Sequence, residues 1–172
     1  MTEILGSLSL DWGDEHACQR CARALAQVPC VGTALIFLEG PLGAGKTTWV
    51  RHLLQALGVS GRIKSPTFAL METYPVSAGL ITHLDFYRFD RPHDWEDAGM
   101  REVLQQSGLK LVEWPSKAEG LPTPDLHVRI EVSTPPSDSP TTDHDAPRHV
   151  LVQAHTACGL QLLRAFEAAD RP

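Results

Sequence analysis

The chain has 172 residues, and we expect residues 1–172 to form a single domain that buries its core without help from metal or disulfides. Its net charge is −6, with 15 basic residues scattered among 21 acidic ones, which disfavours a stand-alone nucleic-acid binder with a clustered basic face. No charged leader precedes an apolar core, and no apolar run approaches the roughly 18 residues of a membrane helix, so we expect a soluble, cytoplasmic protein without membrane contact.

The first third of the chain predicts two strands around an amphipathic helix. Leu8–Leu10 alternates as a short strand, and Asp14 opens a helical pattern that runs to Val28. The apolar run Leu35–Leu38 then predicts a buried strand. This strand leads the chain directly into a glycine-rich segment.

A complete G-x-x-x-x-G-K-[ST] phosphate-binding loop occupies residues 40–47. In such a loop the backbone N–H groups face phosphate oxygens, and the following helix, which begins at about Lys46 and ends at Gly58, points its positive end the same way. Lys46 then reaches the β- and γ-phosphates, and the Thr47 hydroxyl lies where Mg²⁺ bridges them. The predicted nucleotide-binding residues of this segment are Pro41, Leu42, Gly43, Ala44, Gly45, Lys46, Thr47 and Thr48.

The rest of the chain alternates predicted strands and helices. A turn at residues 64–67 precedes two strands that a hairpin connection joins at Pro75–Gly79. The predicted elements are strands at Phe68–Tyr74, Leu80–Asp85, Leu109–Val112, Leu126–Val132 and His149–His155, with helices at Ala98–Leu104 and Ala157–Ala169. Ser133–Pro147 is rich in Pro, Ser, Thr and Asp and predicts a mobile surface loop. This order predicts a three-layer α/β domain, a P-loop NTPase fold with a mostly parallel sheet and one antiparallel hairpin.

Two acidic residues at predicted strand ends are candidates for the reaction. A phosphate-binding loop needs a carboxylate that positions Mg²⁺, and Glu113 follows a strand at the edge where ligands gather in parallel sheets. Asp85 also ends a strand, and we expect it to hold a metal-bound water or to orient the attacking water. The alternatives are a solvated glutamate at position 113 and a structural aspartate at position 85 that pairs with Arg88.

The four cysteines do not predict a metal or redox centre. Cys18 and Cys21 form a C-x-x-C, but the pair lies within a helical pattern and no second pair accompanies it, so a zinc site is disfavoured. We interpret both as core thiols and place Cys30 and Cys158 in the same class.

The sequence also bears on the class of phosphate-loop protein. A GTPase would carry an N-K-x-D element, and the chain contains no asparagine, which disfavours a guanine-specific switch protein. A small-molecule kinase shares the size and the loop, but it usually needs a lid that bears arginines. Arg88, Arg91 and Arg101 are the arginines in the middle third of the chain, and none is arranged as such a lid.

Four segments in order resemble the TsaE (YjeE) family, over about residues 5 to 132. They are the loop through Thr48, the S-P-T-F of residues 65–68, the H-L-D-F-Y-R of residues 83–88 and the V-E-W-P of residues 112–115. The resemblance implies a bacterial ATPase that uses ATP and Mg²⁺ and acts with TsaB and TsaD to make threonylcarbamoyladenosine in tRNA next to the anticodon. The acidity of the chain argues for tRNA contact only indirectly, through that complex.

The resemblance implies catalytic and metal-binding roles for four residues. Lys46 and Thr47 would hold the phosphates and Mg²⁺, and Glu113 would complete the metal site. Asp85 would position or activate the water that attacks the γ-phosphate. Because the sequence shows no clear arginine finger, we expect slow hydrolysis by the isolated protein and stimulation by TsaB and TsaD.

The same resemblance implies that Ser65 and Thr67 lie in a switch-like segment near the γ-phosphate and that Trp114 lies close to the nucleotide. Two alternatives remain open. In one, ATP binding orders the segments 65–67 and 85–88 for docking, and hydrolysis only releases the assembly. In the other, the protein is a small-metabolite kinase that transfers phosphate to an acceptor.

Overall fold

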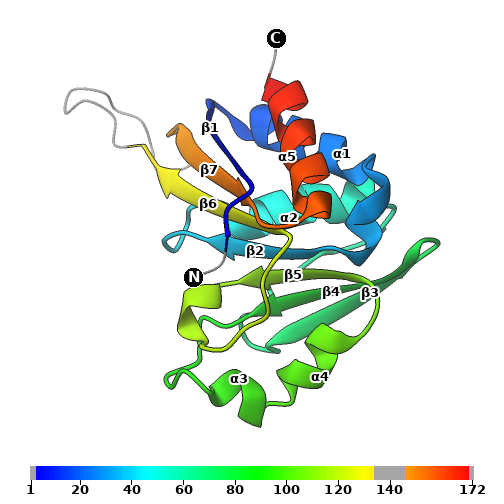
Figure 1. Ribbon diagram of the computed structural model, residues 1–172, viewed down its shortest axis with the longest axis vertical. Helices are drawn as coiled ribbons and strands as arrows, with labels where there is room; N and C mark the ends of the chain where they lie inside the picture. The colour runs from blue at the N-terminus through cyan, green and yellow to red at the C-terminus, as the bar shows by residue number, and fades with distance from the viewer. Residues whose placement is uncertain (1–2, 134–145, 171–172) are drawn as a thin grey trace.

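Seven strands in the described residues, 3–133 and 146–170, form one sheet in this computed structural model (Figure 1). The strands are β1 (Gly6–Trp12), β2 (Leu35–Glu39), β3 (Met71–Val76), β4 (Gly79–Asp85), β5 (Leu109–Glu113), β6 (Leu126–Val132) and β7 (Arg148–Ala154). They lie in the order β1-β7-β6-β2-β5-β4-β3. The central strands β6, β2, β5 and β4 are parallel, whereas β3 pairs with β4, and β7 with β1 and β6, in antiparallel fashion. The predicted α/β fold is confirmed, and the β1–β7 edge adds a second antiparallel region to the expected hairpin.

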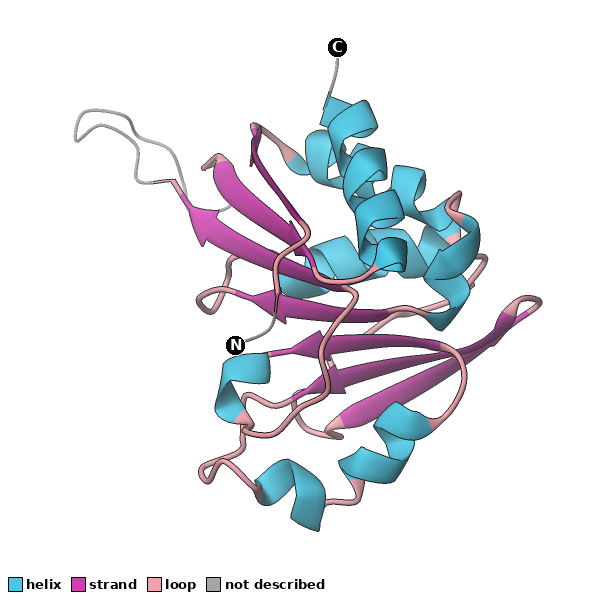
Figure 2. Ribbon diagram, viewed as in Figure 1, coloured by secondary structure: helices cyan, strands magenta, loops and turns pink. Residues whose placement is uncertain are grey.

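Helices cover both faces of the sheet (Figure 2). On one face lie α1 (Glu15–Ala26), α2 (Lys46–Ala56) and α5 (Ala157–Asp170), and on the other lie α3 (Asp94–Asp97) and α4 (Met100–Gln105). Two 3-10 turns, η1 (Pro29–Thr33) and η2 (Pro115–Lys117), follow α1 and β5. The turn α3 occurs in a polar segment where the sequence predicts no helix. Buried Trp95 anchors it there by donating from Nε1 to the carbonyl of Glu119 at 2.8 Å.

Alternation along the strands divides the core into two layers. In β2, Ile36 and Leu38 pack on the side of α1, α2 and α5, whereas Phe37 packs on the side of α3 and α4. In β5, Leu111 lies in the first of these layers. Glu113, two residues later, therefore points toward the face that carries α2. The carboxyl ends of β2 and β5 thus meet the start of that helix.

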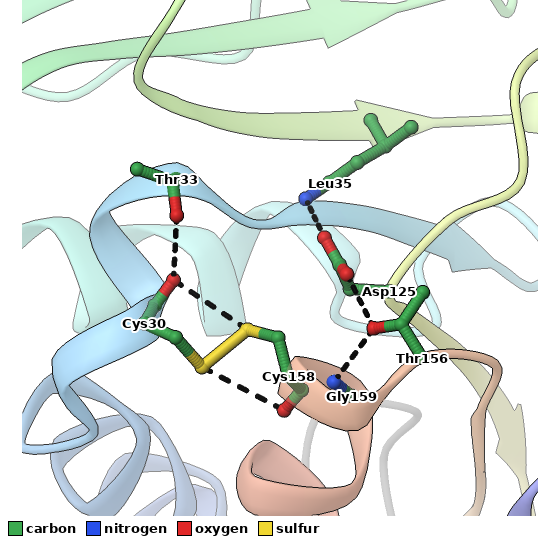
Figure 3. Close-up of a disulfide and its surroundings, with 7 residues drawn as sticks. All are labelled: Cys30, Thr33, Leu35, Asp125, Thr156, Cys158 and Gly159. Carbon is green, nitrogen blue, oxygen red and sulfur yellow. Dashed lines mark hydrogen bonds between the residues drawn. A yellow bond between two sulfur atoms is a disulfide. The ribbon is translucent and has the colours of Figure 1, made fainter.

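Cys30 and Cys158 form a disulfide (Figure 3), which corrects the prediction that all four cysteines are thiols. Their Cα atoms are 6.0 Å apart, although the two residues are 128 positions apart in the chain. The fold brings η1 beside the first turn of α5, and no local sequence pattern predicts this contact. Cys18 and Cys21 are buried thiols of α1, as predicted, and burial raises the pKa of both.

The predicted mobile loop at Ser133–Pro147 lies mostly outside the described residues. At its ends the backbone N–H of Ser133 donates to the carbonyl of Pro147 at 2.9 Å, which holds the end of β6 beside the start of β7. Within the part of the chain that the structure describes, no helix is long and apolar enough to cross a bilayer.

Candidate nucleotide-binding site

The loop between β2 and α2 turns at the carboxyl edge of the sheet. Gly40 has a φ of 144°, and a Cβ atom there would lie 2.1 Å from the carbonyl oxygen of Ile130, so a glycine is needed for the loop to pass β6. Gly45 has a φ of 107° and immediately precedes Lys46, the first residue of α2. The loop therefore wraps around the N-terminus of an 11-residue helix, which is the arrangement that binds phosphate.

A cavity of about 530 Å³ lies beside this loop and collects most of the predicted site residues. The predicted residues that line it are Leu42, Gly43, Ala44, Gly45, Lys46, Thr47, Thr48, Asp85, Glu113 and Trp114, together with Ser65 and Thr67 of the switch-like segment. Pro41 is not part of the lining, but its carbonyl accepts a hydrogen bond from Lys46 at 3.0 Å. The fold thus gathers the loop, residues 65–67 and the ends of β4 and β5 around one space.

Lys46 is 4% exposed and is held by its own loop. Its Nζ donates to the carbonyl oxygens of Gly40 at 2.7 Å and Pro41 at 3.0 Å. It also lies 4.0 Å from the ring centroid of Trp114, whose backbone has a left-handed φ of 58°. Burial lowers the pKa of Lys46, and the carboxylate of Glu113 partly opposes that shift. A phosphate bound here would offset the desolvation of this ammonium group.

Thr47 and Glu113 meet directly in the cavity. The Thr47 hydroxyl donates to the Glu113 carboxylate, with its oxygen 2.9 Å from Oε1 and 3.2 Å from Oε2. Glu113 is 2% exposed, which excludes the alternative of a solvated glutamate. His83 approaches the same carboxylate, with Nε2 2.8 Å from Oε1. The carboxyl group of Glu113 is therefore buried beside two polar side chains.

The Thr47–Glu113 pair fits a Mg²⁺ ion. A hydroxyl and a carboxylate are oxygen donors, and Mg²⁺ is commonly held by one or two carboxylates while phosphates and water supply its other ligands. In the described ranges no cluster of three or more His, Cys, Asp or Glu could hold a metal. Two oxygen donors leave most of the coordination of Mg²⁺ to phosphate and water oxygens, so the pair suits an ion that is shared with a phosphate ligand.

Asp85 contacts the switch-like segment. Its Oδ2 accepts from the Thr67 hydroxyl at 2.6 Å and from the Ser65 hydroxyl at 3.3 Å. Its Oδ1 accepts from the backbone N–H of Tyr87 at 2.9 Å. Arg88, the partner considered in the alternative reading, instead lies over the ring of Phe68, 4.4 Å from the ring centroid. A movement of the Asp85 side chain would therefore directly alter its hydrogen bonds to Ser65 and Thr67.

The sequence does not point to most of the rest of the cavity wall. This wall is built by Trp12, Gly13, Asp14, Glu15, Cys18, Tyr87, Ala146 and Arg148. Arg148 begins β7, where its Nε donates to the carbonyl of Ala44 at 3.0 Å and its Nη1 donates to the carbonyl of Ala146. No local signal marks Arg148, because 104 positions separate it from Ala44. Tyr87 and His83 are different, since both lie within the H-L-D-F-Y-R segment that the sequence does single out.

Comparisons with known proteins identify the family of this chain. The family described as "Threonylcarbamoyl adenosine biosynthesis protein TsaE" matches residues 12–139. The chain is 33% identical over 149 residues to the tRNA threonylcarbamoyladenosine biosynthesis protein TsaE of Haemophilus influenzae, covering 86% of this chain and 87% of that protein. It is 34% identical over 132 residues to the TsaE protein of Aquifex aeolicus, covering 76% and 90% of the two chains.

A solved structure shares the fold. The crystal structure of Bacillus subtilis YdiB superposes with a TM-score of 0.71 over 99% of this chain and 100% of that chain, at 22% sequence identity. The fold likeness and the sequence matches cover the loop, β4 and β5, which carry the residues gathered in the cavity. The chain therefore belongs to the TsaE family of threonylcarbamoyl adenosine biosynthesis proteins.

Proposed function

We propose that this chain, as one domain over residues 1–172, is a cytoplasmic ATPase that binds and hydrolyses ATP with Mg²⁺. It acts with TsaB and TsaD in the threonylcarbamoyladenosine modification of tRNA next to the anticodon, and it meets tRNA only through that complex. The observation that carries the proposal is the Thr47–Glu113 contact of 2.9 Å, inside the cavity that also holds the phosphate-binding loop. Family membership supports the pathway.

Binding begins with the phosphates. The backbone N–H groups of residues 42–47 and the N-terminus of α2 attract phosphate oxygens, and Lys46 exchanges its loop carbonyls for the β- and γ-phosphates. Thr47 and Glu113 would hold Mg²⁺, which when bound neutralises charge on those phosphate oxygens. Trp114, which lies beside Lys46, borders the same space.

The chemical step is in-line attack by water. Asp85, held by Thr67 and Tyr87, orients a water molecule and accepts its proton as the water oxygen bonds to the γ-phosphorus. The bond between that phosphorus and the bridging oxygen breaks, and the electron pair stays on ADP. Lys46 donates to the oxygens that gain charge. No arginine is assigned to the γ-phosphate in this mechanism, so turnover by the chain alone should be slow.

The test is ATP turnover by the purified chain with Mg²⁺, first alone and then with TsaB, TsaD and tRNA. Slow phosphate release that rises in the mixture supports the proposal. Equal rates with and without the partners would contradict the partner-stimulated reaction. Transfer of phosphate to a small acceptor instead of water would identify a kinase.

A second candidate function is a nucleotide-dependent assembly module. It is favoured by the link from Asp85 through Thr67 to Phe68, which is 82% exposed. A nucleotide bound in the cavity would thereby change the position of Phe68 on a surface that is available for docking. A non-hydrolysable ATP analogue separates the two functions. Full support of tRNA modification over many turnovers with the analogue favours assembly, and arrest after one round favours hydrolysis.

A further inference from the structure

His83 is a buried histidine beside the candidate metal ligand Glu113. It lies in β4, two residues before Asp85, and is 0% exposed. The parallel register sets Asp85 opposite Glu113 and His83 opposite Leu111. Because side chains alternate along a strand, His83, Asp85 and Glu113 project from the same face of the sheet. His83 therefore approaches the carboxylate from the interior of the sheet.

The His83 ring has a hydrogen-bond partner at one nitrogen only, within the described residues. Nε2 lies 2.8 Å from Oε1 of Glu113, whereas Nδ1 has no partner. Buried N–H groups without an acceptor are rare, and a neutral imidazole carries its proton on one nitrogen. We therefore assign the proton to Nε2 from the hydrogen-bond pattern. In this tautomer His83 donates one directed hydrogen bond to the carboxylate.

The two side chains that donate to Glu113 differ in their relation to a metal. Thr47 is itself a proposed ligand, so its oxygen must turn a lone pair toward the ion. His83 contacts Oε1 alone, and Oε2 retains only the Thr47 contact at 3.2 Å among the described residues. His83 can therefore keep its hydrogen bond to the carboxylate while Thr47 and Glu113 coordinate the ion.

We propose that His83 is a positioning residue, which orients Glu113 for Mg²⁺ and thereby sets the affinity of the site for the metal rather than for the nucleotide. The inference rests on the proposed function, because it requires Mg²⁺ at Thr47 and Glu113. Residues that orient a metal ligand without touching the ion typically change metal affinity about 10- to 100-fold when they are removed.

Two substitutions test the directed hydrogen bond. His83→Gln keeps an N–H donor on a side chain long enough to reach Glu113, and His83→Asn keeps a polar amide that is one methylene shorter. A matched control is His127→Asn, since His127 is a partly buried histidine of β6 outside the cavity lining. Each protein is titrated with a fluorescent ATP analogue in EDTA, and then with Mg²⁺ at a fixed analogue concentration.

For His83→Asn we expect the apparent Mg²⁺ affinity to fall about 10- to 100-fold. Binding of the analogue in EDTA should stay within about twofold of the unaltered protein, because the phosphate contacts of the loop are intact. His83→Gln should recover most of the Mg²⁺ affinity, and His127→Asn should not change it. A role for His83 in packing alone would weaken both titrations together and would not distinguish Gln from Asn.

The proposal is overturned if His83→Asn binds Mg²⁺ as the unaltered protein does, or if Gln and Asn lose the same amount. If the Asn variant does not fold, the Gln variant decides, since a tenfold loss of Mg²⁺ affinity in a folded Gln variant also overturns it. Failure of the proposed function looks different. In that case the unaltered protein would bind the analogue with no dependence on Mg²⁺.

Discussion

Replacing Asp85 with asparagine should impair the chemical step far more than the fold. Asp85 is 2% exposed, and its carboxylate accepts hydrogen bonds from Thr67, Ser65 and the backbone of Tyr87. Asparagine keeps the size of the side chain but cannot take a proton from water. A positioned base contributes about 10² to 10⁴ in rate, so we expect turnover to fall at least about 100-fold, equivalent to about 2.7 kcal/mol in the barrier.

Asp85→Asn should also lower the free energy of unfolding, and a control substitution at Asp125 should lower it by a comparable amount. Asn presents one neutral oxygen where Asp85 presents two charged ones, so part of its hydrogen bonding is lost, at about 1 to 3 kcal/mol. Asp125, which directly precedes β6, makes contacts of the same kind (Figure 3). Its carboxylate accepts from the backbone N–H of Leu35 at 2.8 Å and from the Thr156 hydroxyl at 2.5 Å. Asp125→Asn should therefore lose a comparable free energy of unfolding.

The assay measures both quantities for both variants. Urea denaturation gives the free energy of unfolding, and phosphate release at saturating MgATP, with the proposed partners TsaB and TsaD present, gives the turnover. Asp85→Asn should lose turnover and keep its affinity for ATP, whereas Asp125→Asn should keep both. Unchanged turnover in Asp85→Asn would remove Asp85 from the mechanism. An equal loss of turnover in Asp125→Asn would show that the effect is on stability alone.

Two further predictions concern Lys46 and the disulfide. The affinity for ATP should fall as pH rises, with a midpoint below the ordinary lysine pKa of 10.5, because burial lowers the pKa of Lys46 and deprotonation removes its charge. Calorimetric titrations at several pH values measure this affinity. Lys46→Ala should bind ATP about 10- to 100-fold more weakly and should lose the pH dependence. A pH dependence that persists in the alanine variant would assign it to another group. Cys158→Ser should lower the free energy of unfolding of the oxidised protein by about 2 to 5 kcal/mol, because it opens a loop of 128 residues. Chemical denaturation with and without reductant checks this, and a difference that survives reduction would refute the disulfide as its source.

Sequence patterns predict those parts of the site that local spacing determines. The loop from Gly40 to Thr47 is contiguous, and its glycines and lysine are required at fixed intervals, so its position and its helix follow directly. Glu113 and Asp85 are predicted because each ends a predicted strand, and parallel strands place such ends at one edge of the sheet. Their roles in catalysis remain predictions.

The parts that sequence could not supply depend on contacts between distant segments. Arg148 reaches Ala44 only because β7 lies beside β6, and no pattern in either segment sets that pairing. The Cys30–Cys158 bond was missed for the same reason, since both residues are interpreted as core thiols and only the fold brings them together across 128 positions. His83 was visible in its motif, but its hydrogen bond to Glu113 depends on the register of β4 and β5.

The Cys30–Cys158 bond closes a covalent ring that contains Lys46, Asp85 and Glu113. A single cut of the backbone anywhere within this ring cannot release a fragment, because both pieces remain joined through the two sulfur atoms. A protease that nicks the chain once between these cysteines would therefore leave one species on a gel without reductant and two with it. The disulfide thus keeps Lys46, Asp85 and Glu113 in one covalent molecule after any single cut between residues 30 and 158.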